Sequence, residues 1–200
     1  MAIRTLFVDL GGVVVKYKND ITLQGLAALS DKSAAEVEQL IFAKLDKEFD
    51  EGLLNEREFF AKALLELGTV ILEDEFWGCW KNIFQADEGV VQILHEARGN
   101  GVEVIAASNI DPKRFESIRD TGCLAPFHKL GLSFQMKTRK PFKTFFERLM
   151  RMTETPLAEC LFVDDLMKNT DSAIDFGLTS LLFITPDALR RVLRGYGVLP

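Results

Sequence analysis

Four short and almost uninterrupted apolar runs are the feature that most limits what this 200-residue chain can fold into. They cover 3–8, 102–107, 161–163 and 180–184, and a less regular fifth run covers 129–134. Strands that are apolar along their whole length are buried on both faces, which is typical of a parallel sheet covered by helices. The sequence therefore predicts an α/β fold with a Rossmann-like parallel sheet and helices on both faces.

Residues 16–85 lie between the first two apolar runs and show a helical pattern without a clear strand. Ser33 with Glu36, and Asn55 with Glu58, have the spacing of capping boxes at helix N-termini. Apolar residues follow each pair at helical spacing. We expect a small all-helical unit inserted after the first strand.

Helices are also expected between the later strands. The patterns at 90–97 and 142–150 are amphipathic, and the dipeptides at 111–112 and 185–186 place a capping residue before a proline. The alternation of strand and helix completes the pattern of a parallel sheet.

Composition excludes several classes of protein. The net charge of -6 argues against a nucleic-acid partner, which requires a concentrated basic surface. Three widely spaced cysteines and two histidines favour neither a disulfide framework nor a zinc site. No segment has the length and apolar character of a membrane span or the pattern of a signal peptide. We expect a cytoplasmic protein with no membrane partner, and the sequence indicates no oligomeric state.

Polar side chains stand at the ends of three predicted strands. Asp9 follows the first strand, Ser108 the second, and Asp164-Asp165 the third, while Lys140 precedes a proline in a loop. The carboxyl ends of parallel strands form one crevice, so these side chains should gather there. Each residue alone has an ordinary structural explanation as a turn former, a cap or a solvated charge. Helix capping does not explain the full set.

The combination indicates phosphoryl transfer. Crowded carboxylates repel one another, and a hard divalent cation such as Mg²⁺ would neutralise them. Lys140 and Ser108 could hold phosphate oxygens while one carboxylate attacks phosphorus to give an aspartyl-phosphate. Positioning and charge neutralisation dominate catalysis of this kind.

Four segments resemble the motifs of the haloacid dehalogenase (HAD) superfamily, and they occur in that family's order over nearly the whole chain. LFVDLGGVVV resembles the first motif, VIAASN the second, KTRKPFKTFFERL the third and CLFVDDLMKNTDSAIDFGLTSLLF the fourth. The resemblance implies a magnesium-dependent hydrolase that acts on a small phosphorylated metabolite, with a sugar phosphate as one candidate.

The resemblance also implies a role for each site residue. Asp9 would be the nucleophile and a metal ligand. The metal would also contact Asp165, the backbone carbonyl of Gly11, and Asp164 either directly or through a neighbour. The substrate would be bound by Ser108, Asn109 and Lys140, and Asn169 would support the metal site.

The helical stretch matches the position of a type C1 cap in this family. FDEGLLNEREFFAKAL is similar to cap segments of the subgroup that contains glucose-1-phosphate phosphatases and the epoxide-hydrolase N-terminal domain. The implied domains are a core of 1–15 with 86–200 and a cap of 16–85. The cap would open and close over the crevice.

The sequence departs from the family pattern at Gly11, where phosphatases usually carry a second Asp as general acid and base. Loss of a general acid typically costs a factor of about 10² to 10⁴. Some members of the similar subgroup also read Asp-Leu-Gly here. Either the leaving group is a good one, or another acid such as Asp20, Asp50 or Glu51 substitutes.

Other functions remain open at this point. A 2-haloacid dehalogenase also lacks the second Asp, but its fourth motif does not carry the pair Asp164-Asp165. A non-catalytic phosphate-binding module would explain Gly11 but not the retained Asp9, Ser108 and Lys140. A phosphomutase would need the missing acid, and a two-component receiver would carry its acidic pair first.

Overall fold

The computed structural model describes residues 2–80 and 84–200, and its centre is a five-stranded parallel sheet in the order β5-β4-β1-β6-β7. The strands are β1 (Thr5–Val8), β4 (Glu103–Ser108), β5 (Lys129–Leu132), β6 (Cys160–Asp164) and β7 (Thr179–Leu182). All five coincide with the predicted apolar runs to within a few residues. The predicted Rossmann-like fold class is confirmed.

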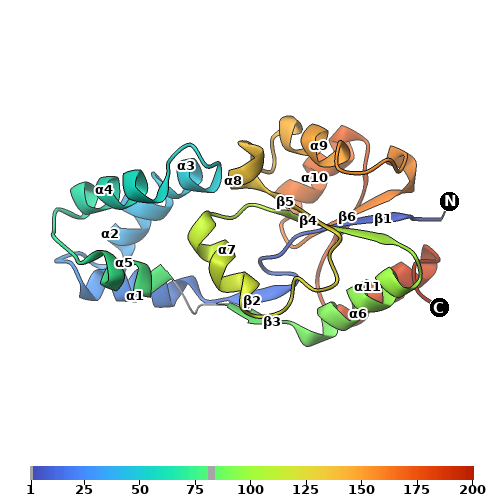
Figure 1. The fold of residues 1–200 in the computed structure, drawn as a ribbon, viewed down its shortest axis with the longest axis horizontal. Coiled ribbons are helices and arrows are strands. Elements are labelled where there is room, and N and C mark those ends of the chain that lie inside the picture. The colour runs from blue at the N-terminus through green and yellow to red at the C-terminus, as the bar shows by residue number, and fades with distance from the viewer. Residues whose placement is uncertain (1, 81–83) are drawn as a thin grey trace.

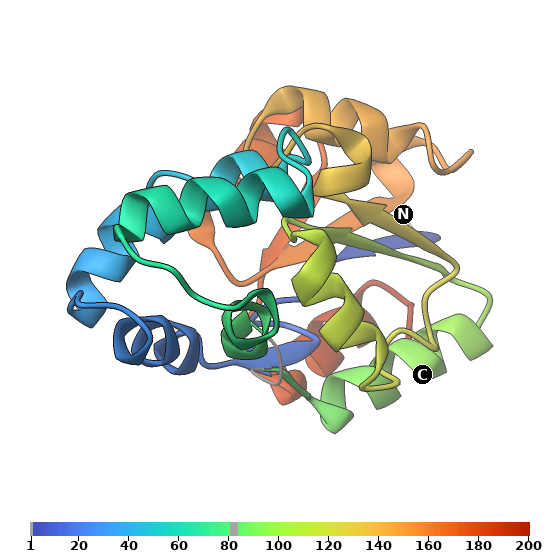
Figure 2. The same cartoon turned by 60° about the vertical axis from the view of Figure 1, so that its left-hand side comes forward.

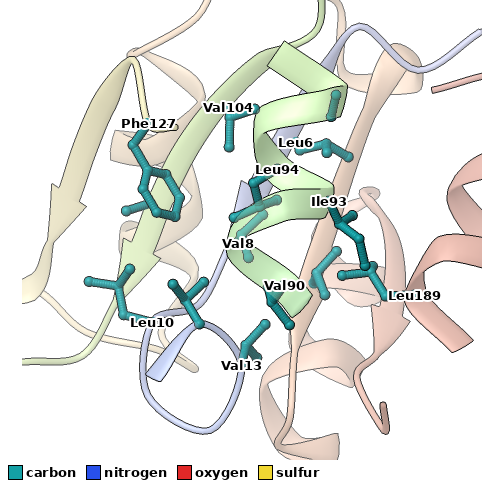
Figure 3. Packing of buried hydrophobic residues seen from close by; sticks show 14 of the residues in the cluster. Leu6, Val8, Leu10, Val13, Val90, Ile93, Leu94, Val104, Phe127 and Leu189 are labelled. Carbon is teal, nitrogen blue, oxygen red and sulfur yellow. The ribbon is translucent and has the colours of Figure 1, made fainter. Parts of the chain in front are cut away.

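Helices cover both faces of this sheet (Figure 1). One face carries α6 (Glu88–Gly99) and α11 (Pro186–Gly195), and the other carries α9 (Lys143–Met150) and α10 (Met167–Phe176). Alternate residues of β1 serve the two layers: Leu6 and Val8 pack under α6 (Figure 3), while Phe7 faces the opposite core. Because β1 is buried on both faces, Asp9 follows a strand that is fixed from every side.

The helices of the inserted segment lie to one side of the sheet (Figures 1 and 2). They are α1 (Asn19–Ala28), α2 (Ala34–Val37), the π-helical η1 (Glu38–Phe42), α3 (Asp46–Asp50), α4 (Glu56–Leu67) and α5 (Glu73–Trp80). Both predicted capping boxes are confirmed. The side chains of Ser33 and Asn55 accept from the backbone N–H of Glu36 and Glu58, and the carboxylates of these glutamates accept from the backbone N–H of Ser33 and Asn55.

This helical segment has a hydrophobic cluster of its own, built from residues between Leu23 and Trp80. Phe59 stacks on Phe49 with ring centroids 4.3 Å apart and also contacts Trp77 and Trp80. The two tryptophans are buried in this cluster. They therefore serve as core residues, and the described pocket linings do not include them.

Two three-residue strands, β2 (Val15–Tyr17) and β3 (Phe84–Ala86), pair antiparallel at the two ends of the helical segment. The prediction of an entirely helical stretch over 16–85 is wrong at these ends. Three residues are too few for the alternation of a strand to show in a sequence. Residues 81–83 of the predicted stretch lie outside the described residues.

The remaining helices connect strands of the sheet. They are α7 (Pro112–Arg119), α8 (Ser133–Met136) and the 3-10 turn η2 (Leu157–Glu159). In both cartoon views α7 faces the helical segment (Figures 1 and 2). Across the described part of the chain, no helix combines the length and the apolar character that crossing a membrane requires.

Candidate active site

Asp9 lies directly after the central strand β1, and the carboxyl end of this strand points toward the helical segment (Figure 1). Its backbone N–H donates to Val163 of β6 at 2.9 Å, and its Oδ1 accepts from the N–H of Leu10 at 2.7 Å. The residue is only 7% exposed. Its position is therefore set by two neighbouring strands and by its own turn.

Lys140 reaches this carboxylate from the loop before α9. Its Nζ lies 3.0 Å from Asp9 Oδ1 and 2.5 Å from Asp164 Oδ2, and the side chain is fully buried. Asn109, a predicted substrate-binding residue, lines the cavity beside Lys140. Its amide also holds the backbone of Lys140: its Oδ1 accepts from Lys140 N at 2.8 Å, and its Nδ2 donates to Lys140 O at 3.0 Å.

The acidic pair after β6 divides into two environments. Asp164 is fully buried, and its oxygens accept from Lys140 Nζ, from Leu166 N at 2.9 Å and from Asn169 Nδ2 at 2.9 Å. Asp165 is only half-buried and lines the cavity. These contacts favour Asp164 as a positioning residue and leave Asp165 as the carboxylate that faces the ligand space.

Gly12 makes room for Asp165, and the sequence interpretation did not single it out. A Cβ at Gly12 would lie 2.1 Å from Asp165 Oδ2, and the backbone φ of +78° is one that residues with a side chain rarely adopt. The second glycine of the Gly11-Gly12 pair is thus required by the carboxylate packed against it.

The cluster concentrates negative charge. Carboxylate oxygens of Asp9, Asp164 and Asp165 lie within 4.8 Å of one another, and Lys140 is the cation in contact with two of them. Burial is the main reason that the pKa of Asp9 rises from 3.8 to about 7, and the charges of Asp164 and Asp165 add to the rise although Lys140 opposes it. Burial and Asp164 also raise the pKa of Asp165. The arrangement fits a divalent cation, which would relieve this repulsion.

A second observation supports this fit. Asn169 Oδ1 is buried and has no hydrogen-bond partner among the described residues. A buried amide oxygen normally accepts a hydrogen bond, and an unpartnered one calls for a water or an ion. A hydrated cation beside the three carboxylates would provide such a donor.

The raised pKa of Asp9 predicts a pH-dependent stability. A carboxyl whose pKa is raised on folding favours the folded state when protonated, so stability is lost as the pH rises through about 4 to about 7. In chelator, Asp9→Asn should therefore exceed the wild type in unfolding free energy by about 2–4 kcal/mol at pH 8 and by much less at pH 5. Urea unfolding at both pH values measures this. A difference that does not change with pH would contradict the raised pKa.

A cavity of about 190 Å³ opens over the cluster. The structure brings all the predicted site residues together: Asp9, Gly11, Ser108, Asn109, Lys140, Asp165 and Asn169 line the cavity, and the buried Asp164 contacts Lys140 and Asn169. Residues that the sequence interpretation missed also line the cavity: Tyr17, Asn19, Asp46, Phe84, Ile110, Arg114, Ile118, Arg139, Leu166 and Lys168. Arg139, Leu166 and Lys168 belong to the third and fourth quoted segments, whereas Tyr17, Asn19, Asp46 and Phe84 come from or border the helical segment, where no motif marks them.

The three acids proposed as substitutes for the missing general acid lie elsewhere. Asp20 is exposed on α1, and Glu51 is the C-cap residue that follows α3. Asp50 is buried at the end of α3, and burial raises its pKa well above the ordinary value. None of the three is among the described residues that line the cavity.

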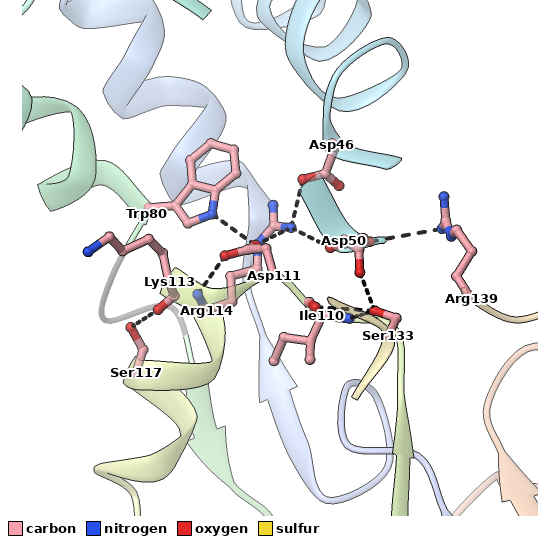
Figure 4. A network of polar contacts seen from close by, with 10 residues as sticks. All are labelled: Asp46, Asp50, Trp80, Ile110, Asp111, Lys113, Arg114, Ser117, Ser133 and Arg139. Atoms are coloured by element: carbon pink, nitrogen blue, oxygen red, sulfur yellow. Dashed lines mark hydrogen bonds and ion pairs between the residues drawn. The ribbon is translucent and has the colours of Figure 1, made fainter. Parts of the chain in front are cut away.

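Arg114 of α7 joins the helical segment to the sheet domain next to this cavity (Figure 4). Its Nη1 lies 2.8 Å from Asp46 Oδ1, 3.0 Å from Asp111 Oδ2 and 3.8 Å from Asp50 Oδ1. Its guanidinium also stacks over Trp80 at 4.5 Å. A single buried arginine thus holds three carboxylates, two of which belong to α3.

No protein-family model matches the chain. It is 26% identical over 199 residues to a drimenol cyclase of Aspergillus calidoustus, covering 96% of this chain and 36% of that protein. It is 30% identical over 96 residues to a sesquiterpene phosphatase of Aspergillus oryzae, covering 48% of this chain and 49% of that protein. The chain therefore spans between a third and a half of the length of these relatives.

Solved structures share the fold over nearly the whole chain. A HAD-like family hydrolase of Porphyromonas gingivalis superposes with a TM-score of 0.85 at 20% identity, covering 97% of this chain and 99% of that one. A HAD family enzyme of Bacteroides thetaiotaomicron in complex with magnesium and inorganic phosphate gives 0.76 at 20% identity, covering 90% and 93%. An L-2-haloacid dehalogenase of Xanthobacter autotrophicus gives 0.65 at 15% identity, covering 99% and 85%.

Proposed function

We propose that this chain, which has the fold of the HAD-like hydrolases, is a Mg²⁺-dependent phosphatase that acts on a small phosphorylated organic molecule. One observation carries the proposal: Asp9, Asp165 and the buried Lys140 meet at the floor of a cavity of about 190 Å³. The arrangement combines a nucleophile, a cation for phosphate oxygens and an acidic cluster for a metal. The sesquiterpene phosphatase and the magnesium and phosphate complex among the similar proteins support it.

The metal would be held by Asp9, Asp165 and the carbonyl of Gly11, with Asp164 and Asn169 steadying them. When bound, Mg²⁺ would neutralise the carboxylates and polarise the phosphoryl oxygens. Asp164 already uses its oxygens on three donors, which suits a positioning role.

Asp9 would attack phosphorus through Oδ2. Its Oδ1 is held by Leu10 N and by Lys140, whereas Oδ2 has no such donor among the described residues. The new bond joins Asp9 to phosphorus as the ester oxygen departs, and water then hydrolyses the aspartyl-phosphate to restore Asp9 and release phosphate. Lys140 would hold the carboxylate and a phosphate oxygen, and Ser108 would donate to another.

The cavity wall suggests the kind of organic group that is cleaved. Phe84, Ile110, Ile118 and Leu166 place apolar surface around the charged floor. The same wall also carries Asn19, Asp46, Arg114, Arg139 and Lys168, so it suits an ester with an apolar face, as in the substrate class named for the sesquiterpene phosphatase, as well as a sugar phosphate. We further propose that residues 16–85 form a cap over this cavity and that 1–15 with 86–200 form the catalytic core.

The site argues against the alternative functions. A haloacid carries a single negative charge, whereas this floor gathers three carboxylates that call for a divalent cation. Chloride release from 2-chloropropionate in chelator would reveal a dehalogenase. Tight binding of inorganic phosphate without any turnover would identify a binding module.

The direct test is phosphate release from p-nitrophenyl phosphate with Mg²⁺ and with chelator, in the wild type and in Gly12→Ala. The added methyl collides with Asp165, so we expect a loss of about 10²-fold or more, because a displacement of about 1 Å at a reacting site can cost that much. Gly122→Ala is the matched control. The φ of Gly122 is +76°, close to the +78° of Gly12, so the backbone strain of the alanine is similar, but a Cβ at Gly122 meets nothing within 4 Å.

The control should keep full activity while losing about 1–2 kcal/mol of stability from backbone strain. Wild-type turnover that persists in chelator would contradict the metal-dependent mechanism. Equal activity of Gly12→Ala and the wild type would contradict the placement of Asp165 at the metal.

A further inference from the structure

The proposed reaction leaves one chemical requirement without a residue. When the ester bond to phosphorus breaks, its electron pair stays on the departing oxygen, and a donor placed at that oxygen lowers the barrier. Gly11 has no side chain to supply such a donor. The inference below rests on the proposed phosphatase function and concerns the group that meets this oxygen.

The side chain of Tyr17 covers the space above Gly11. A Cβ placed on Gly11 would lie 3.4 Å from Tyr17 Cε1 and 3.7 Å from Cδ1. Because Cε1 adjoins the carbon that bears the hydroxyl, the half of the ring with the hydroxyl is the nearer one. Tyr17 also lines the cavity together with Asp9, Lys140 and Asp165.

The backbone holds Tyr17 in this place. Gly12 N donates to Val15 O at 2.9 Å, which ties the start of β2 to the loop after Asp9. Tyr17 is paired in register with Phe84 of β3, and their rings lie 6.3 Å apart. The side chain is thus fixed relative to the nucleophile by the short sheet that the sequence did not reveal.

Two of the other donors that line the cavity are already paired with carboxylates. Arg114 is surrounded by Asp46, Asp50 and Asp111, and Lys140 is bound to Asp9 and Asp164. The Tyr17 hydroxyl, by contrast, has no hydrogen-bond partner within the described ranges 2–80 and 84–200, and the residue is 43% exposed and lines the cavity. It is a neutral donor that is available to a ligand.

We propose that Tyr17 is a catalytic residue whose hydroxyl donates a hydrogen bond to the departing ester oxygen. As Asp9 forms its bond to phosphorus, the ester bond breaks and the charge develops under this hydroxyl. A water molecule supplies the proton to the departing oxygen, and the resulting hydroxide is consumed when the aspartyl-phosphate is hydrolysed. Tyr17 lowers the cost of the charge and is unchanged at the end of the cycle.

The test compares two substrates of nearly the same shape, phenyl phosphate and p-nitrophenyl phosphate. Phenolate is the more basic leaving group and depends more on a donor. We expect Tyr17→Phe to lower kcat/KM by about 10²-fold for phenyl phosphate, the size seen when one oxyanion donor is removed, and by less than about tenfold for p-nitrophenyl phosphate. Each substrate serves as the control for the other, since partial loss of folded enzyme lowers both equally.

Tyr196→Phe is the matched variant, because Tyr196 lies beyond α11, outside the cavity lining. It should leave both substrates unaffected. Equal losses on both substrates for Tyr17→Phe, or no loss on either, would overturn the proposal. A wild type that hydrolyses neither substrate would instead refute the phosphatase function itself, so the two failures are distinguishable.

Discussion

Asp9→Asn is expected to lower kcat for p-nitrophenyl phosphate by about 10⁴-fold or more, the effect typical of removing a covalent nucleophile. The amide has nearly the same shape and can still accept from Leu10 N, but it cannot form an acyl phosphate. The fold should persist, because the substitution removes one charge from an over-crowded acidic cluster. Steady-state kinetics with saturating Mg²⁺ measure the loss.

Asp20→Asn is the matched control for this variant. Asp20 is exposed on α1 and lies outside the described cavity lining, so the activity of Asp20→Asn should equal that of the wild type. Unchanged activity on phenyl phosphate as well would exclude Asp20 as the missing acid, because that leaving group depends on a donor. Appreciable turnover by Asp9→Asn would refute the assignment of the nucleophile.

The largest loss of stability is expected for Arg114→Met. The variant keeps an apolar side chain against Trp80 but leaves Asp46 and the fully buried Asp111 without Arg114, while Asp50 keeps Arg139 at 3.9 Å. Breaking a buried ion pair by removing one partner typically costs about 3–5 kcal/mol. Denaturant unfolding at pH 8 should show a loss of that size. The loss should shrink at lower pH, because the stranded carboxyls then become protonated.

Arg119→Met on the same helix is the control. Its side chain is 63% exposed and lies 3.8 Å from Asp120, a surface pair of a kind that contributes about 0–1 kcal/mol. Equal stability of Arg114→Met and Arg119→Met would show that the helical segment does not depend on the arginine contact.

Much of the fold could be predicted because the signals that identify its strands and helices lie within short segments of the sequence. Fully apolar runs identify the strands of a buried sheet, and the capping boxes at Ser33 and Asn55 mark helix starts without any tertiary information. The gathering of Asp9, Ser108 and Asp165 followed from a single topological fact, since the carboxyl ends of parallel strands share one edge.

The details that the sequence missed depend on contacts between distant segments. Asn109 binds the backbone of Lys140, which lies 31 positions later in the sequence, and Gly12 packs against the carboxylate of Asp165, more than 150 positions away. Strand β2 is too short to show a period, so neither the strand nor the position of Tyr17 could be inferred. The assignment to the subgroup of glucose-1-phosphate phosphatases, the catalytic roles and the cytoplasmic location stay predictions.

The central claim is that Asp9 carries the phosphoryl group during turnover. The most direct measurement quenches the wild-type enzyme in acid during turnover with Mg²⁺ and then treats it with borohydride, which reduces an aspartyl-phosphate to homoserine. We expect homoserine in place of Asp9 in the tryptic peptide 5–16, and only when substrate is present. Homoserine at another aspartate, or its absence while phosphate is being released, would contradict the account.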